Sequence, residues 1–144
     1  VFQDFNIFPY TIAENIATSN NYNSDMIFSS LKNVDLFKKV MSLPINIYSK
    51  ISDSLEDTNV INLSIGESQK LVIARTQYFN KQINIYDEPT SSLDPYAEME
   101  IYSMIQNSLN STAIFISHRL STCKFCKKIL FADSGFHEIS LRRF

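Results

Sequence analysis

The sequence predicts an α/β fold with parallel strands, from the order of three segments in its second half. Two short apolar runs, residues 83–86 and 112–117, are bounded by turn signals and have the length of buried strands. Between them, residues 95–109 carry apolar side chains at helical spacing. A strand, helix, strand order brings the carboxyl ends of both strands to one edge of a sheet, where open α/β sheets bind ligands.

Chargeable side chains follow both strands at that edge. Asp87 and Glu88 come at the end of the first run, and His118 follows the second. One carboxylate can hold Mg²⁺ while the other orients or deprotonates a water for attack on a phosphate. A histidine there can hydrogen-bond a γ-phosphate and sense its loss. Taken alone, the acidic pair fits a solvated strand cap better, and the histidine an ordinary surface residue.

The first part of the chain predicts a strand end followed by short helices. Residues 1–8 form an aromatic-rich strand end and a turn. Thr11 and Glu14 have the spacing of a capping box, which predicts a short helix after Thr11. Residues 24–41 have apolar side chains at helical spacings with a break in the middle, which favours two short helices. The polar residues 49–59 predict a loop.

A longer helix is predicted over residues 65–79. Ser64 followed three residues later by Glu67 is a second capping box, so the helix begins here with free backbone amides at its amino end. Such an end attracts phosphate through those amides and the helix dipole. A turn at Asn80 and Lys81 ends the helix before the first apolar run.

The helix over residues 95–109 has a clear start and two distinct faces. Asp94 is a good N-cap, and Pro95 suits the first helical position. Its apolar face carries Ala97, Ile101, Met104, Ile105 and Leu109, and the polar face opposite carries Glu98, Ser103 and Gln106.

The last part of the chain predicts a helix through Cys126, a strand over residues 128–132 and a second strand over 136–139, joined by a hairpin turn at 133–135. Cys123 and Cys126 form one Cys-x-x-Cys. Half a zinc site or a redox pair is conceivable, but no second pair stands at ligand spacing, so we interpret them as small, partly buried thiols.

Composition limits the classes of function. The chain has 144 residues, 44% of them hydrophobic, enough for one domain with a core. The net charge is −2 and the lysines are scattered, so we expect no nucleic-acid partner. No apolar run approaches the roughly 18 residues that span a bilayer, and no signal-peptide pattern is present, so we expect a soluble piece.

Glycine content excludes one phosphate-binding loop from these residues. A G-x-x-x-x-G-K-[ST] loop needs two glycines five residues apart, because backbone amides must approach the phosphates without a Cβ in the way. The chain has only Gly66 and Gly135. It also begins at Val1, inside a recognisable motif, so we expect an upstream region to supply that loop.

Several stretches, in their order and separation, resemble the motifs of an ATP-binding cassette (ABC) ATPase. They are the signature loop with its helix at residues 63–75, Walker B with the D-loop at 83–94, the switch-histidine loop at 114–122, and the Q-loop and following segment at 1–5 and 11–16. The resemblance implies the distal part of a RecA-like P-loop NTPase core, with a parallel sheet and an inserted α-helical subdomain. Residues 1–8 would be the Q-loop strand end, 9–79 the helical subdomain and 80–144 the core.

The resemblance also implies a role for each motif residue. It assigns Mg²⁺ to Asp87 and Gln3, the catalytic base to Glu88 and the γ-phosphate sensor to His118. The residues implied to contact ATP, in part across a head-to-tail dimer, are Gln3, Leu63, Ser64, Gly66, Glu67 and Asp94.

The signature loop departs from the family pattern LSGGQ at two positions. Ile65 adds a β-branched side chain where close approach is wanted, and Glu67 places negative charge near a triphosphate. A solvent-screened charge there weakens binding by about 1 kcal/mol. We therefore expect a slow or asymmetric ATPase, faster after Ile65→Gly and Glu67→Gln.

The implied function is ATP hydrolysis that powers export, most like the bacterial exporters of peptides such as lantibiotics or of lipophilic drugs. The implied partners are a second nucleotide-binding domain and a transmembrane domain, and the implied location is the cytoplasmic face of the plasma membrane. These residues alone are expected to be inactive. Two alternatives stay open: a truncated, non-catalytic module that donates its signature loop, and a soluble, non-transport ABC ATPase.

Overall fold

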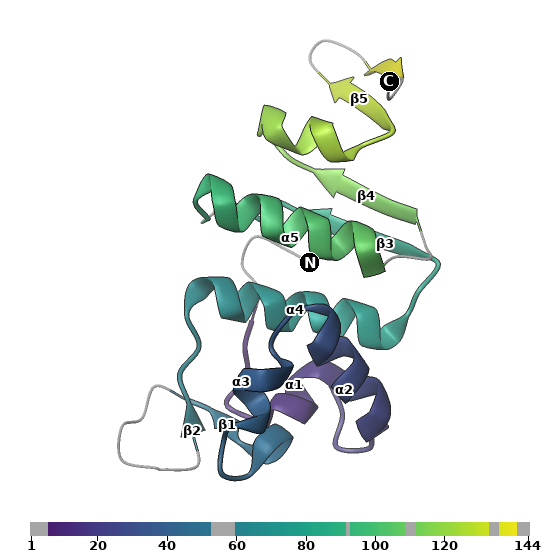
Figure 1. Cartoon of the computed structure of the whole chain (residues 1–144). Coiled ribbons are helices and arrows are strands. Elements are labelled where there is room, and N and C mark those ends of the chain that lie inside the picture. Colours follow the sequence, from purple (N-terminus) through teal and green to yellow (C-terminus); the bar gives the residue numbers. More distant parts are fainter. Residues whose placement is uncertain (1–5, 53–59, 92, 109–111, 133–135, 141–144) are drawn as a thin grey trace.

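The computed structural model describes residues 6–52, 60–91, 93–108, 112–132 and 136–140 (Figure 1). One long helix, α4, crosses the middle of the molecule, with short helices on one side and a strand pair with its helix on the other (Figure 1). In chain order the elements are α1 (Ile12–Ala17), α2 (Ser24–Asn33), α3 (Phe37–Met41), the 3₁₀ turn η1 (Asn46–Tyr48), β1 (Lys50–Ile51), β2 (Val60–Ile61), α4 (Ile65–Phe79), β3 (Ile83–Asp87), α5 (Pro95–Ser108), β4 (Thr112–Ile116), the 3₁₀ helix η2 (Leu120–Phe125), β5 (Lys128–Ala132) and β6 (Phe136–Ser140).

The short helices before α4 follow the sequence prediction. Thr11 and Glu14 form the predicted capping box of α1. Two helices, α2 and α3, occupy residues 24–41, and the break between them contains Asp35 with a left-handed φ of 57°. Both α1 and α2 pack against α4, and their apolar faces form one buried cluster with it.

The loop predicted over residues 49–59 is wrong in part. Residues 50–51 form β1, which pairs in parallel with β2, and residues 53–59 lie outside the described ranges. The strand forms because its backbone meets the segment before α1: the Ile51 amide donates to the Tyr10 carbonyl at 3.0 Å. The buried Ile51 side chain joins the core, which explains an ordered pair in a polar stretch.

Helix α4 begins and ends where the sequence predicts. Ser64 and Glu67 form its capping box, and Asn80 ends it in the left-handed conformation, with φ 43°. Its middle is buried against the short helices through Leu71, Ile73 and Ala74. Because α4 also contacts α5, it joins the two sides of the molecule.

The predicted parallel pair is confirmed, with Ile85 opposite Ile114 and Asp87 opposite Ile116. One face of the pair is covered: Tyr86 is buried and its ring stacks on Phe115 at 5.3 Å. The other face exposes four isoleucines, so the expectation that both strands are buried on both faces is wrong for the described residues. Those isoleucines are Ile83, Ile85, Ile114 and Ile116.

Helix α5 begins at Pro95 as predicted, and the Asp94 side chain accepts from the amides of Tyr96 and Ala97 at 2.9 and 3.2 Å. The polar face assigned to this helix is wrong at Glu98, which is only 4% exposed. Its carboxylate is buried because Arg119 pairs with it. Leu109 of the predicted apolar face lies outside the described residues.

The last elements differ from prediction in one helix. The helix expected through Cys126 is the 3₁₀ helix η2, and it stops at Phe125, with the Cys126 amide bonding the Cys123 carbonyl three residues back. β5 and β6 pair antiparallel as the hairpin predicted, and its turn at 133–135 lies outside the described residues. Both cysteines are free and partly buried, and burial raises the pKa of Cys126, as suits an unreactive structural thiol.

None of the helices in the described ranges combines the length and the apolar character that crossing a bilayer requires.

The Asn15 side chain hydrogen-bonds the backbone of the segment before α1, and its replacement should lower the stability of the fold. Its buried side chain accepts from the Phe8 amide at 2.9 Å and donates to the carbonyls of Phe8, Tyr10 and Thr11. Asn15→Ala removes four hydrogen bonds and leaves the Phe8 amide without an acceptor among the described residues, while the three carbonyls keep backbone donors, so we expect the free energy of unfolding in urea to fall by about 2–3 kcal/mol. Asn20→Ala, at an exposed position, should change it by less than about 0.5 kcal/mol. Equal effects of both substitutions would contradict the role of Asn15.

Candidate functional site

Glu88 and His118 meet at the carboxyl edge of the β3–β4 pair. The Glu88 amide donates to the Ile116 carbonyl at 2.9 Å, which extends the parallel ladder by one residue. Glu88 Oε1 then accepts from the His118 amide at 3.0 Å and lies 2.6 Å from His118 Nδ1. With a carboxylate at that distance, Nδ1 is the donor, and the His118 side chain remains 76% exposed.

The second carboxylate oxygen of Glu88 has no partner among the described residues. Oε2 is buried and accepts no hydrogen bond, while Oε1 is held by His118. The Glu88 backbone is also left-handed, with φ 46°, a conformation that costs a non-glycine residue free energy and recurs at functional sites. A carboxylate oxygen that no donor of the described residues occupies can accept a hydrogen bond from a substrate water, as a general base must.

Asp87 lies on the open face of the strand pair. It has the same strand parity as Ile83 and Ile85, whose side chains are exposed, and its carboxylate makes no hydrogen bond or ion pair with a described residue. Mg²⁺ prefers carboxylate oxygens and is commonly held by one or two of them together with phosphate oxygens. Asp87 is therefore suited to be a Mg²⁺ ligand. It would be a single protein carboxylate, because no group of three or more acidic, histidine or cysteine side chains that could hold a metal occurs in the described ranges.

A second set of predicted residues lies at the amino end of α4. The Glu67 amide donates to Ser64 Oγ and the Ser64 amide to Glu67 Oε2, whereas the amides of Ile65 and Gly66 donate to none of the described residues. An added Cβ on Gly66 would meet only Leu93 Cδ2, at 3.9 Å, and the backbone φ is not positive. Neither crowding within the chain nor backbone conformation requires a glycine here, which leaves the approach of a ligand as a reason.

The two departures in the signature loop have different surroundings. Ile65 is 61% exposed and covers no part of the core. The Glu67 carboxylate pairs with Lys39 Nζ on α3 at 2.6 Å. Burial alone would raise the pKa of Glu67, but the hydrogen bonds from Lys39 and from Ser64 together lower it below its usual value. Lys39 thus offsets part of the negative charge that the sequence places at this helix end.

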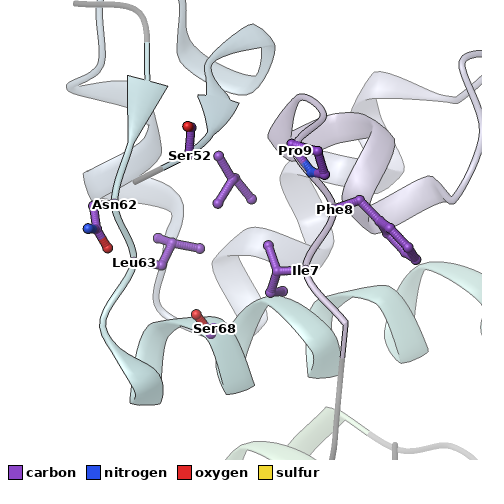
Figure 2. A pocket seen from close by; sticks show the side chains of 8 residues that line it. Ile7, Phe8, Pro9, Ser52, Asn62, Leu63 and Ser68 are labelled. Atoms are coloured by element: carbon purple, nitrogen blue, oxygen red, sulfur yellow. The ribbon is translucent and has the colours of Figure 1, made fainter. Parts of the chain in front are cut away.

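Leu63 lies apart from the free amides. Its side chain packs against the core and lines a cavity of about 410 Å³ that Ile7, Phe8 and Pro9 enclose from the other side. Figure 2 shows Ile7 and Leu63 projecting into this cavity, with Ser68 of α4 beside them. We call it the α4 cavity.

Arg75 of α4 fixes the segment that forms one wall of the α4 cavity. Its Nε donates to the Asn15 carbonyl at 2.8 Å, Nη2 donates to the Asn6 carbonyl at 3.3 Å, and the guanidinium lies over the Phe8 ring. Burial lowers the pKa of Arg75, although an arginine remains charged. The segment that follows residues 1–5 is therefore tied directly to the helix that carries Gly66.

The predicted site residues fall into two groups. Asp87, Glu88 and His118 share one strand edge, whereas Ser64, Gly66 and Glu67 form the start of α4, and no hydrogen bond or ion pair among the described residues joins the groups. Gln3 lies outside the described residues.

The match to a family model decides the family. Residues 1–91 match the model of the ABC transporter. The chain belongs to the ABC transporter family. The α/β fold with a parallel strand pair agrees with this family, as predicted from the sequence.

Alignments with two bacterial relatives cover nearly the whole chain. It is 33% identical over 157 aligned residues to the nisin transport ATP-binding protein of Lactococcus lactis, covering 99% of this chain and 25% of that protein. It is 34% identical over 136 residues to the ATP-dependent lipid A-core flippase of Burkholderia thailandensis, covering 94% of this chain and 22% of that protein.

A solved structure has the same fold. The structure of a bacterial Atm1-family ABC exporter with ATP bound matches with a TM-score of 0.73 and 30% sequence identity. The match covers 92% of this chain and 23% of that chain. The chain therefore spans about a quarter of the length of these ABC transporter relatives.

Sequence reasoning missed three charged residues around these ABC motifs. Lys39 lies far from Glu67 in the sequence, so no local pattern signals the pair. Glu98 and Arg119 pair across 21 residues, and the Glu98 carboxylate also accepts from Ser121. The one available signal was the position of Arg119 directly after His118, next to the predicted strand edge.

The Lys39–Glu67 pair predicts a pH dependence of stability. Because the folded-state pKa of Glu67 is lowered from 4.5, its contribution is present above pH 4.5 and is lost as pH falls through the folded pKa. Lys39→Ala should make the decline of the unfolding free energy below that pH shallower. Lys38→Ala, beside it on an exposed position, should keep the original slope in urea titrations. Identical slopes for both variants would refute the pairing.

Proposed function

We propose that this chain is the distal part of the nucleotide-binding domain of an ABC exporter, and that the whole protein hydrolyses ATP with Mg²⁺ to drive export. The observation that carries the proposal is the state of Glu88, whose Oε1 is held by His118 while Oε2 is buried without a donor. In this division residues 1–8 are the Q-loop strand end, 9–79 the helical subdomain and 80–144 the distal core.

The chain's own residues suggest how hydrolysis proceeds. Glu88 Oε2 accepts the hydrogen bond of the attacking water and then its proton. His118 holds Oε1 through its amide and Nδ1, which directs Oε2 toward that water and leaves the exposed imidazole for the transferred phosphoryl group. Asp87 holds Mg²⁺, which supplies charge stabilisation of the phosphates when bound, and we assign Gln3 to the same ion by resemblance.

We assign the amino end of α4 to a nucleotide held by a second domain. The free amides of Ile65 and Gly66 suit phosphate oxygens, and they lie in a group separate from Glu88. A head-to-tail dimer of such domains would place each α4 against the other domain's ATP, with Leu63 and Glu67 at the edge of that contact and Asp94 at the interface. Ser64 supplies the cap that leaves the amides in place.

The exposed face of the strand pair is an argument for a further layer of the domain that covers this face and carries the phosphate-binding loop. Four isoleucines and Asp87 lie on that face, and burying such a face stabilises a fold by about 25 cal/mol per Å². A layer that covers the isoleucines would also bring the phosphates held by its loop close to Asp87. We infer that the 144 residues alone neither bind ATP tightly nor hydrolyse it, because only Gly66 and Gly135 are available for a phosphate loop.

We place the contact with a transmembrane part at the α4 cavity. The cavity is bounded by the segment after residues 1–5 and by α4, so a partner seated there touches both the Q-loop side and the signature helix. Phe8 and Tyr10 are exposed beside it and stack on each other at 6.1 Å. The names of the matched relatives describe transport, a flippase and an exporter, which supports export, and we propose that the chain acts at the cytoplasmic face of the plasma membrane.

Glu88→Gln tests the proposed function in the full-length protein. The amide keeps the shape and the His118 contact but cannot take a proton, so we expect ATP turnover to fall by about 10²–10⁴-fold with ATP binding retained. Glu100→Gln, on the exposed side of α5, is the matched control and should turn over normally.

Two results would contradict the proposal. Turnover of the Glu88→Gln protein at the original rate would exclude Glu88 as the base. Activity that arises only when the chain is mixed with an intact cassette domain, and that survives Glu88→Gln, would identify a signature-loop donor in place of an enzyme.

Gly66→Ala separates function from folding. Alanine favours a helix by up to about 1 kcal/mol over glycine and meets no close contact here, so the melting temperature should stay level or rise. The added methyl group obstructs phosphate approach, so we expect turnover to fall about tenfold. Thr76→Ala on the same helix, remote from its amino end, should raise helix propensity without lowering turnover. Full turnover in the Gly66→Ala protein would remove α4 from the ATP site.

A further inference from the structure

Arg119 links the switch-histidine loop to the loop over residues 91–94. Its Nη1 and Nη2 donate to the Leu93 carbonyl at 3.4 and 3.3 Å, and Nη2 also donates to the Ser91 carbonyl at 3.4 Å. The Arg119 amide donates to Ser117 Oγ at 3.0 Å, which fixes the backbone on both sides of His118. One guanidinium therefore holds two segments that are far apart in the sequence.

Glu98 anchors that guanidinium from inside the molecule. Its carboxylate is 4% exposed, accepts from Arg119 Nη1 at 2.5 Å and accepts from Ser121 Oγ at 2.5 Å. Well-packed apolar residues stabilise a fold as well as a buried ion pair does, so stability alone does not require these charges. A buried carboxylate that holds a planar guanidinium fixes the orientation of the arginine head group. The remaining N–H donors of the guanidinium then point in set directions, because they lie in one rigid plane.

A chain of buried hydroxyl groups runs parallel to this pair. Thr90 Oγ1 donates to the Tyr102 hydroxyl at 3.3 Å, which lies 2.8 Å from Thr122 Oγ1, and Thr122 Oγ1 donates to Ser117 Oγ at 3.0 Å. The turn after Glu88 is thus joined to the loop of His118 by a second route. Both routes cross α5, which carries Glu98 and Tyr102.

Leu93 brings the other phosphate-facing group into contact with this network. A Cβ on Gly66 would lie 3.9 Å from Leu93 Cδ2, so the Leu93 side chain borders the amino end of α4. The carbonyl of the same residue accepts from Arg119. Leu93 therefore adjoins Gly66 on one side and bonds Arg119 on the other, and Arg119 is next to His118 in the chain.

We propose that Arg119, anchored by Glu98, is a positioning residue that couples the amino end of α4 to the Glu88–His118 pair through the Leu93 carbonyl. The inference rests on the proposed function. A displacement of the start of α4 reaches the adjoining Leu93 side chain, and reaches the switch loop through the guanidinium that holds the Leu93 carbonyl. Hydrolysis then depends on the state of both groups, although no hydrogen bond or ion pair among the described residues joins them.

Arg119→Lys tests the inference in the full-length protein. Lysine keeps the charge opposite Glu98 but lacks the fork that reaches the two carbonyls. We expect kcat to fall about tenfold, with KM for ATP within about twofold and an unchanged melting temperature. Glu98→Gln should also lower kcat, while Glu100→Gln, two positions along α5, should leave it unchanged.

A double-substitution cycle with Gly66→Ala distinguishes coupling from a merely structural role. If Arg119 transmits the state of the α4 end, then Arg119→Lys has much less effect on kcat in the Gly66→Ala background than in the original protein. Additive effects, an unchanged kcat, or a joint loss of kcat, KM and melting temperature would overturn the inference. Failure of the proposed function gives a different result: the Glu88→Gln protein would then turn over ATP at the original rate, whatever the Arg119 variants do.

Discussion

The parallel register of β3 and β4 is the constraint on which the rest of the site depends. Because Asp87 lies opposite Ile116, the next residue of each strand emerges at the same edge, and the Glu88 amide can bond the Ile116 carbonyl. At that position the Glu88 backbone is left-handed and its side chain contacts His118. A shift of the register by one residue would move every side chain of a strand to the other face and separate the two groups.

Local sequence patterns predicted most of the fold and the strand edge at which Glu88 and His118 meet. The capping boxes at Thr11 and Ser64, the proline after Asp94 and the two apolar runs are short-range signals, and each marks the element it predicted. The meeting of Glu88 and His118 followed from topology alone, since parallel strands end at one edge. The match over residues 1–91 shows membership of the ABC transporter family, and the roles of these residues are proposals drawn from the resemblance to it.

Long-range charge pairing is what the sequence did not reveal. A helical pattern places every charged residue on the solvent side, and this rule failed at Glu98 because its partner comes 21 residues later. The same limit applies to Glu67, because its partner Lys39 lies 28 residues earlier in the sequence. The apolar runs of β3 and β4 correctly predicted two strands. They did not predict that one face of the pair is exposed among the described residues.

Helix α4 has a mechanical consequence that follows from its length and its point of attachment. At 1.5 Å per residue, the nine steps from Gly66 to Arg75 make an arm of about 14 Å. Arg75 grips the segment along the α4 cavity, so this end is the pivot. A tilt of about 10° there moves the far end by about 2 Å, roughly the difference between a formed hydrogen bond and a broken one. Under the proposed function, the helix is a lever by which a slight rotation beside the cavity makes or breaks a contact with phosphate.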